Sequence, residues 1–327
     1  MVNKKILITG ACGTIGKVLL KKLSKSLTVQ KIYAIDNDES KIFYLKKKYK
    51  NNPKVTILLL DLSDHNVYGN YIGPIDTIFH LAAYKHVLLC EQLPENAIKN
   101  NINVLINLIN YAIKNKINNF IFTSSDKAAN PTNVMGITKL LGEKIIINSN
   151  YSYPNSKTNF YIIRFGNVLG SSGSVLEVFK KQIDNNKDLT LSSNEMTRFI
   201  MAINEAVNFI INLNKLIKPG EILIPKMRSI LIKDLAKVIL DNYKNKPQYR
   251  NRNLKIRLTQ IDKGEKFFEE LYTENESLYI KEKEKYFILN PNSKINFKNK
   301  IFSYRSNLKK NISLSQIKDF LTKNNYI

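Results

Sequence analysis

A glycine-rich turn between an apolar run and an amphipathic segment restricts the fold of this chain more than any other feature. Residues 5–9 (KILIT) form an apolar run that ends at Gly10, which is typical of a buried parallel strand. From Thr14 onward, apolar residues recur at the spacing of one helix face. Gly10, Gly13 and Gly16 therefore lie on a strand-to-helix turn, where glycine permits a tight bend and a close approach of the backbone.

The same alternation continues through the first half of the chain. We predict strands at 31–36, 55–64, 76–86 and 120–125, and helices at 38–50, 94–115, 133–148, 202–217, 229–243 and near Ser313. This order predicts an α/β fold with a doubly wound parallel sheet of the Rossmann type. We assign residues 1–165 to the Rossmann domain and residues 166–327 to a smaller α/β lobe, partly interleaved with it.

The residues that follow the strands are suited to a dinucleotide. The helix that begins at Thr14 offers free N–H groups to a pyrophosphate. Asp36 ends the second strand, where a carboxylate binds ribose hydroxyls and repels a 2′-phosphate, so NAD is favoured over NADP. A solvated acid in a turn is the alternative for Asp36. The predicted coenzyme-binding residues are Gly10, Gly13, Thr14, Ile15, Gly16, Asp36, Asp61, Leu62, Ala82, Ala83 and Lys139.

Composition excludes several classes of protein. The net charge of +24 comes from lysines spread through every segment, without a basic stripe interleaved with aromatics, so we expect no nucleic-acid partner. Cys12 and Cys90 fit no metal spacing, and we expect no metal site. The first strand leaves no room for a signal peptide, and no apolar run approaches the length of a membrane span. We therefore expect a cytoplasmic protein.

The segment 124–139 (SSDKAANPTNVMGITK) carries the candidate chemistry. Lys139 lies one helical turn after Met135, where a short-chain oxidoreductase of the Tyr-x-x-x-Lys type would have a tyrosine. A thioether cannot carry a proton. Either the chain is not catalytic, or the proton chemistry has moved to Ser125, Asp126 and Lys127, and we favour the second interpretation.

A resemblance supports this choice. The chain resembles the bacterial UDP-N-acetylglucosamine 4,6-dehydratases of capsule, flagellin and glycan synthesis, in the extended short-chain dehydrogenase/reductase superfamily. The matching motifs run in one order along the chain: TGACGTIG (9–16), HLAAYKHV (80–87), SSDKAANPTNVMGITK (124–139), RFGNVLGSSGSV (164–175), EMTRFIM (195–201), GEILIPKM (220–227) and GEKFFEEL (264–271). One branch of that family has Met in place of Tyr, and this chain resembles its short soluble form.

The resemblance implies a redox-neutral dehydration in which hydride leaves C4 of the hexose, water is lost across C5 and C6, and hydride returns to C6. Lys127 would be the base at C5, with a pKa lowered by burial and by Lys139. Asp126 would be the acid at the C6 oxygen, Ser125 would hold the 4-oxygen, and Lys139 would bind the nicotinamide ribose. Asp126, or a water that it holds, is the candidate that takes the 4-hydroxyl proton.

The resemblance also implies a UDP-sugar site in the second lobe. Asn167 and Arg198 would hold the diphosphate together with Lys85, and arginine suits this because its planar fork donates two hydrogen bonds. The sequence departs from the family at Asp262, where the family usually has arginine before Gly-Glu-Lys. Lys263 or Arg257 is a candidate replacement for the missing charge.

Three readings of function stay open at this point. The first is the UDP-N-acetylglucosamine 4,6-dehydratase, with retention or inversion at C5 undecided. The second is a UDP-hexose 4- or 5-epimerase on the same scaffold, and the third is a non-catalytic NAD-binding protein, motivated by Met135. From the family, helices 94–115 and 133–148 are expected to form a contact in a homo-oligomer, a dimer or larger.

Overall fold

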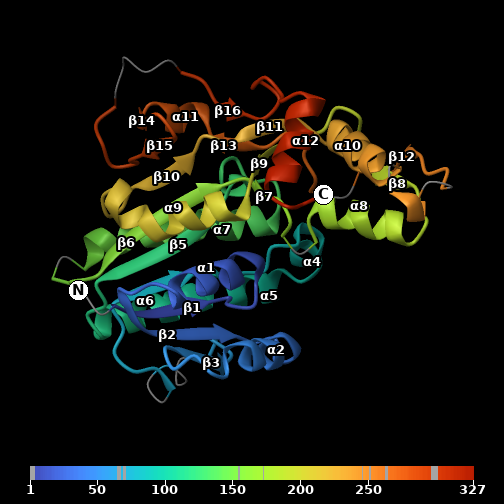
Figure 1. Ribbon diagram of the computed structural model, residues 1–327. Coiled ribbons are helices and arrows are strands. Elements are labelled where there is room, and N and C mark those ends of the chain that lie inside the picture. Colours follow the sequence, from blue (N-terminus) through green and yellow to red (C-terminus); the bar gives the residue numbers. More distant parts are fainter. Residues whose placement is uncertain are drawn as a thin grey trace.

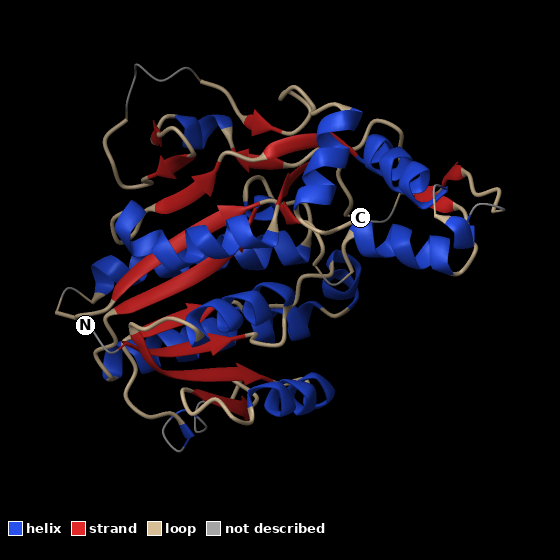
Figure 2. Cartoon of the chain, in the orientation of Figure 1, coloured by secondary structure: helices blue, strands red, loops and turns tan. Residues whose placement is uncertain are grey.

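A twisted sheet with helices on both faces forms the centre of the protein (Figures 1 and 2). The computed structural model describes residues 4–64, 68, 71–153, 155–171, 173–244, 246–249, 252–261, 264–295 and 301–327. Within them, the central sheet has the strand order β14 (Ile280–Glu282), β15 (Tyr286–Leu289), β10 (Ile222–Pro225), β6 (Asn159–Phe165), β5 (Asn119–Ser125), β4 (Thr77–His80), β1 (Lys4–Thr9), β2 (Val29–Asp36) and β3 (Val55–Leu59). The strands from β3 to β10 are parallel, and β15 pairs antiparallel with both β10 and β14. The predicted doubly wound α/β fold is confirmed.

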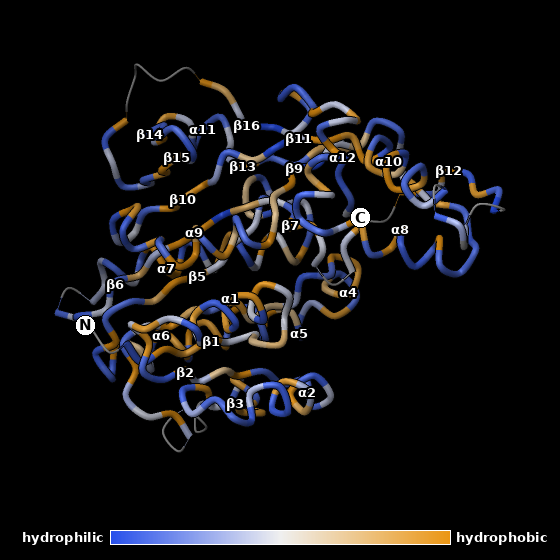
Figure 3. The backbone as a smooth tube through the Cα atoms, viewed as in Figure 1, coloured by the Kyte–Doolittle hydropathy of each residue, from blue (hydrophilic) through white to orange (hydrophobic). Residues whose placement is uncertain are grey.

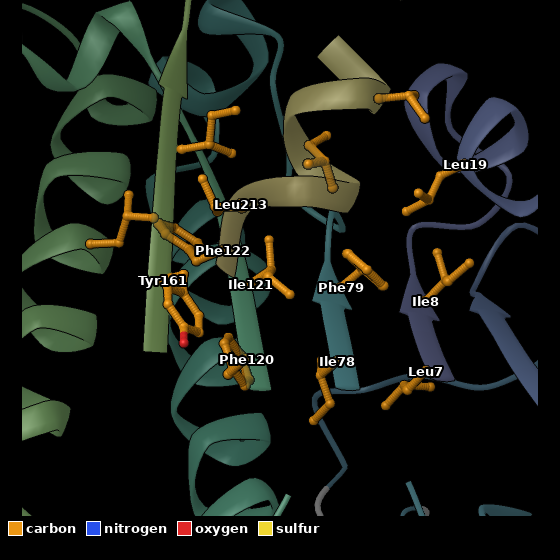
Figure 4. Close-up of a cluster of buried hydrophobic side chains, with 14 of the residues drawn as sticks. Leu7, Ile8, Leu19, Ile78, Phe79, Phe120, Ile121, Phe122, Tyr161 and Leu213 are labelled. Atoms are coloured by element: carbon orange, nitrogen blue, oxygen red, sulfur yellow. The ribbon is translucent and has the colours of Figure 1, made fainter. Parts of the chain in front are cut away.

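The core forms because these strands are apolar on both faces, as buried parallel strands require. Figure 3 shows apolar residues along the central strands, and Figure 4 shows side chains of β1, β4, β5 and β6 packed with Leu19 and Leu213 of the covering helices. The helices of this part of the chain are α1 (Thr14–Ser24), α2 (Glu39–Tyr49), α4 (Val87–Gln92), α5 (Pro94–Ile98), α6 (Val104–Lys114), α7 (Val134–Ser152) and α9 (Ile203–Leu216). No helix among the described residues is long and apolar enough to span a membrane.

The second half of the chain builds smaller sheets beside the central one. They contain β11 (Arg228–Leu231), β9 (Thr197–Met201) and β7 (Asn167–Val168); β12 (Ile256–Leu258) and β8 (Leu189–Leu191); and β13 (Glu270–Tyr272) and β16 (Tyr304–Arg305). A separate apolar cluster packs beneath α8 (Val175–Asp184), α10 (Ile232–Lys244) and α12 (Leu314–Lys323), while the short α11 (Glu274–Ser277) follows β13. Because β10, β15 and β14 return to the central sheet, chain order and spatial order differ here. The domain boundary at 165/166 stays a prediction.

Several predicted elements were wrong in their limits. The strand predicted at 55–64 ends at Leu59, since Asp61 then accepts a hydrogen bond from the Ser63 N–H and forms a turn. The strand predicted at 76–86 is only β4, and residues 229–231 of the predicted helix 229–243 belong to strand β11. The helix predicted at 94–115 is interrupted by a π-helical turn, Lys99–Asn103, in which the buried Asn101 side chain bonds both backbone groups of Tyr84.

A buried guanidinium ties the central sheet to the second half of the chain. Arg164 of β6 has no exposed surface. It donates to Glu143 of α7, at 2.9 and 2.5 Å, and to Glu276 of α11, at 2.9 and 2.8 Å. Its Nη1 also donates to the Leu271 carbonyl at 3.0 Å. This fork fixes α7 and the segment around β13 on the same side of β6.

We expect Arg164→Met to lower the free energy of unfolding by about 3–5 kcal/mol, because Glu143 is left buried without its cation. Urea unfolding measures this. The matched control is Arg228→Met. The Arg228 side chain is 44% exposed and pairs with Glu205, so its loss should cost no more than about 1 kcal/mol. Equal losses in the two variants would contradict a structural role for the fork.

Candidate active site

The glycine turn after β1 is closed so tightly that side chains are excluded. Gly10 has φ +66°, and a Cβ there would lie 2.8 Å from the Ala82 backbone nitrogen. A Cβ on Gly16 would lie 2.2 Å from the Gly10 carbonyl oxygen, so α1 packs directly on the turn. Gly13 caps α1 without a side-chain hydrogen bond, and the first turn of α1 (Thr14, Ile15) carries no acid. The N-terminus of α1 is therefore suited to a pyrophosphate.

Asp36 lies beside this turn at the end of β2. One carboxylate oxygen accepts from the Cys12 N–H at 2.9 Å, and the other accepts from the Asp38 N–H at 3.2 Å. Burial, then the Asp36 charge, raises the pKa of the Cys12 thiol to about 12, so the thiol stays neutral. A carboxylate fixed at this place fits the ribose of NAD and repels a 2′-phosphate.

The other predicted coenzyme-binding residues surround the same sheet edge. Asp61 is exposed, and the Ser63 N–H hydrogen bond lowers the pKa of its carboxyl group; the neighbouring Leu62 is buried. Ala82 and Ala83 are half-buried after β4. These residues fit a dinucleotide, and their role stays a prediction.

The sequence analysis missed His80, which supports the turn from β4. The Thr9 hydroxyl accepts from the Leu81 and Ala82 N–H groups at 3.2 and 3.3 Å, so it must donate to His80 Nδ1 at 2.8 Å. Burial lowers the pKa of His80 to about 3, which keeps the ring neutral and able to accept. The pair sets the path of the chain toward Ala82.

The Ser125-Asp126-Lys127 segment leaves β5 as a 3-10 turn, Asp126–Ala128, and brings its side chains together. Asp126 Oδ1 accepts from the Ser125 hydroxyl at 2.8 Å and from Lys127 Nζ at 3.1 Å. Asp126 Oδ2 is buried without a hydrogen-bond partner among the described residues, and a Cβ on Gly166 would lie 3.0 Å from it. A side chain at position 166 would therefore crowd this oxygen, which still has no partner and can donate or accept a proton.

A second buried carboxylate, from Glu269, faces the same ammonium. Glu269 Oε1 lies 3.0 Å from Lys127 Nζ and 3.8 Å from Arg198 Nε. Arg198 also lies 3.6 Å from Glu265, and its Nη1 donates to the Thr197 carbonyl at 2.8 Å. The motif GEKFFEEL was visible in the sequence, but nothing in its spacing placed Glu269 beside Lys127.

The expected lowering of the Lys127 pKa was wrong. Burial favours the neutral amine, but the carboxylates of Asp126 and Glu269 outweigh it and raise the pKa of Lys127. Burial and the Glu269 charge together raise the pKa of the Asp126 carboxyl group, although Lys127 opposes them. Burial favours the neutral form of Glu269 as well, but the charges of Lys127 and Arg198 outweigh burial and lower the pKa of Glu269. The proton therefore rests on Lys127.

Lys139 has the opposite environment. Its Nζ donates to the Thr123 carbonyl at 3.0 Å and lies 4.9 Å from the centre of the Phe122 ring. Burial lowers its pKa to about 8, with only partial opposition from the Glu143 charge. Met135, one turn earlier on α7, is buried in a small apolar cluster with Cys90 and offers no proton.

The predicted substrate-binding residues come from three segments. Asn167 of β7 pairs with Ile200 of β9, so the register puts it on the same side of the strand pair as Arg198. Lys85 lies just before α4, and the next residue, His86, lies against Gly173 in the loop after β7. Asp262 and Lys263 lie outside the described residues. Arg257 lies on β12 and pairs with Asp188, the residue before β8. In the described part of the chain, no group of three or more His, Cys, Asp or Glu side chains could hold a metal ion.

Comparison with known proteins now adds to this geometry. A family model described as "Polysaccharide biosynthesis protein" matches residues 6–291. The chain belongs to this family.

Curated relatives in the family carry more than one activity in their names. An uncharacterized membrane protein of Methanocaldococcus jannaschii is 39% identical over 99% of this chain and 97% of its own length. An inverting UDP-N-acetylglucosamine 4,6-dehydratase of Campylobacter jejuni is 34% identical over 93% of this chain and 88% of its own. A UDP-glucose 4-epimerase of Rickettsia bellii is also 34% identical, over 84% and 79%.

Among solved structures, Pen from Bacillus thuringiensis superposes with a TM-score of 0.93 at 34% identity, covering 100% of this chain and 99% of that one. The resemblance to the bacterial 4,6-dehydratase family, drawn from motifs, is therefore confirmed. The relatives do not separate dehydration from epimerisation.

The pKa of about 8 for Lys139 predicts a pH-dependent stability difference from Lys139→Met. Between about pH 8 and 10.5 the unfolded chain holds more protons at this lysine than the folded one. The stability of the wild type relative to the variant should therefore rise across this window, by about 1.4 kcal/mol per pH unit at most, and stay constant below it. Urea unfolding at several pH values measures this, with Lys144→Met, exposed on the same helix, as the control. A flat difference would contradict the assignment.

Proposed function

We propose that this protein is an NAD-dependent nucleotide-sugar 4,6-dehydratase. It converts UDP-N-acetylglucosamine to a UDP-4-keto-6-deoxy-N-acetylhexosamine for surface glycan biosynthesis. The observation that carries the proposal is the hydrogen-bonded set Ser125, Asp126 and Lys127 at the end of β5, with both a carboxyl group and an amine available for proton transfer. The family and its dehydratase members support it.

NAD, bound at the glycine turn, would supply the hydride acceptor for C4 and the hydride donor for C6. Asp36 would hold its adenosine ribose and Lys139 its nicotinamide ribose. Lys85, Asn167 and Arg198 would hold the diphosphate of the substrate. Nη1 of Arg198 is held by the Thr197 carbonyl, whereas Nη2 and Nε have only ion pairs of 3.6 and 3.8 Å, so these two nitrogens can donate to a phosphate.

The eliminating step requires a base at C5 and an acid at the C6 oxygen. Lys127 cannot take the C5 proton while it is a cation. Transfer of its proton to Asp126, along the 3.1 Å hydrogen bond, leaves a neutral amine and a carboxylic acid at once. The 4-hydroxyl proton, released when hydride leaves C4, would therefore pass to solvent through a water held by Asp126, and a proton from solvent would restore the pair after turnover. Ser125 then stays beside Asp126 to hold the 4-oxygen. A buried carboxyl group with a raised pKa is suited to receive the proton of Lys127.

The test is incubation of the protein with UDP-N-acetylglucosamine and NAD in deuterated water, followed by proton NMR of the sugar. A new C6 methyl signal is expected. Asp126→Asn should lower the rate about 10²- to 10⁴-fold, because the acid is lost. The control Asp234→Asn removes a carboxylate that pairs with Lys237 within α10 and should keep the rate.

Other outcomes of the same experiment favour the other functions. An inverted C4 without deuterium, or an inverted C5 that carries deuterium, would favour an epimerase if the C6 hydroxymethyl group is intact, because hydride held by NAD does not exchange with water. A 4-epimerase is the activity named for the Rickettsia relative. Binding of NAD without any change in the sugar would favour the non-catalytic reading that Met135 suggested.

We also propose that two copies of the chain associate through α7 and the α5–α6 segment. These elements lie against one another and expose Ile98, Ile106, Ile137 and Leu141. Exposed apolar side chains on neighbouring helices are typical of a protein–protein contact.

Light scattering should therefore give the mass of a dimer or larger oligomer. The double variant Ile137→Glu with Leu141→Glu should give the monomer mass, because it places charges in the contact. Leu27→Glu, at a site that is 81% exposed elsewhere on the chain, is the control. An unchanged mass in the double variant would contradict this interface.

A further inference from the structure

Glu269 is the buried carboxylate of this site to which the proposed reaction gives no role. It is 2% exposed, and its Oε1 lies 3.0 Å from Lys127 Nζ. Lys127 Nζ is therefore held between two carboxylates from distant parts of the chain, since Asp126 Oδ1 lies 3.1 Å away on the other side. Glu269 Oε2 is buried and has no hydrogen-bond partner among the described residues.

This arrangement bears on the proton that Lys127 must release. A carboxylate in contact with an ammonium group stabilises the charged form, and the low dielectric of a buried site strengthens the effect. Glu269 contacts Lys127 directly, whereas the structure gives no contact between Glu269 and Asp126. Its charge therefore opposes the transfer of a proton from Lys127 more strongly than it assists the uptake of that proton by Asp126.

We propose that Glu269 is a positioning residue that holds Lys127 in its ammonium form and links it to Arg198. This inference rests on the proposed function only for its effect on turnover, because the effect on Lys127 itself exists in the resting protein. The other charged groups around the pair are Arg198 on β9, with Glu265 and Lys266 in the segment before Glu269.

The structure also explains how Glu269 is kept in place. Its backbone N–H donates to the Ser306 hydroxyl at 3.0 Å, and its carbonyl accepts from the Ser306 N–H at 2.9 Å. The same hydroxyl lies 2.8 Å from Thr197 Oγ1, next to Arg198. Glu269 and Arg198 are therefore fixed at one spacing by a shared partner. Glu269 thus connects Arg198, the proposed diphosphate ligand, with Lys127, the proposed base.

The test is Glu269→Gln, which keeps the shape of the side chain and removes its charge. Acetic anhydride labels only the neutral amine, so the labelling rate of Lys127 at pH 9, read by mass spectrometry, reports its neutral fraction without any turnover. The rate should rise about tenfold or more in the variant, since a contacting opposite charge shifts a pKa by about one unit or more. Labelling of Lys139, which is buried nearby and has Glu143 rather than Glu269 as its charged neighbour, should stay unchanged in the same digest and shows that the site has not opened.

Three further measurements separate charge from packing. Glu269→Asp keeps the charge and should restore most of the wild-type labelling rate. Glu270→Gln changes the neighbouring buried acid, which pairs with Arg305, and should leave Lys127 labelling unchanged. In turnover, the rising limb of the kcat–pH profile should move to lower pH in Glu269→Gln. In Glu265→Gln, which loses only an Arg198 contact, the change should fall on KM instead.

Wild-type labelling of Lys127 in Glu269→Gln would overturn the inference, and so would an equal increase in Glu270→Gln. These outcomes are independent of the proposed function. A wild-type protein that forms no C6 methyl product, but whose Lys127 labelling depends on Glu269, would contradict the dehydratase and keep the inference.

Discussion

One ion cluster, Arg164 with Glu143 and Glu276, joins the two elements that bring Lys139 and Glu269 to the site. Glu143 lies one turn after Lys139 on α7, and the Leu271 carbonyl that Arg164 also binds lies two residues after Glu269. Removing these charges from water costs several kcal/mol per ion, and only a fully bonded geometry offsets that cost. The cluster therefore contributes less to net stability than to uniqueness. A shifted α7 or β13 would leave a buried charge unpaired, so one arrangement of the site is selected.

Within that frame, two buried lysines on adjacent elements carry opposite pKa shifts. Lys139 has a carbonyl oxygen and an aromatic face as neighbours, so burial decides and its pKa falls to about 8. Lys127 has two carboxylates, which outweigh burial and raise its pKa. Desolvation alone would lower the pKa of both lysines. The contrast lets one site hold a lysine that stays a cation and a lysine that loses its proton near pH 8, and this matters because Met135 supplies no hydroxyl group.

Much of the fold could be predicted from sequence because it depends on local patterns. The glycine turn, the apolar strands and the helix periodicity can each be recognised within about a dozen neighbouring residues. The errors lie where a side chain overrides the local pattern. Asn101 opens a π-helical turn in a segment that reads as one continuous helix, and Ser229 lies in a strand because β9 offers it a partner. Neither partner is near in the sequence.

The candidate site was predictable in part for the same reason. Ser125, Asp126 and Lys127 are consecutive, so their motif was visible, but the charge state of Lys127 depends on Glu269, far along the chain. The pKa of Lys127 was expected to fall because of burial and the charge of Lys139, but it rises. No spacing in the sequence shows that folding brings the Glu269 carboxylate into contact with Lys127.

The Ser306 hydroxyl shows how this long-range geometry is held. It lies 2.8 Å from Thr197 Oγ1 and accepts from the Glu269 N–H at 3.0 Å, so strand β9 and the segment before β13 are bonded to the same atom. Arg198 follows Thr197, and the Glu269 side chain reaches Lys127. An anion that binds Arg198 and shifts strand β9 would therefore also shift the Glu269 backbone, because both are bonded to the Ser306 hydroxyl. The charges of Arg198 and Glu269 are coupled here by backbone hydrogen bonds as well as by Coulomb attraction, and the coupling does not weaken with salt as a surface pair would.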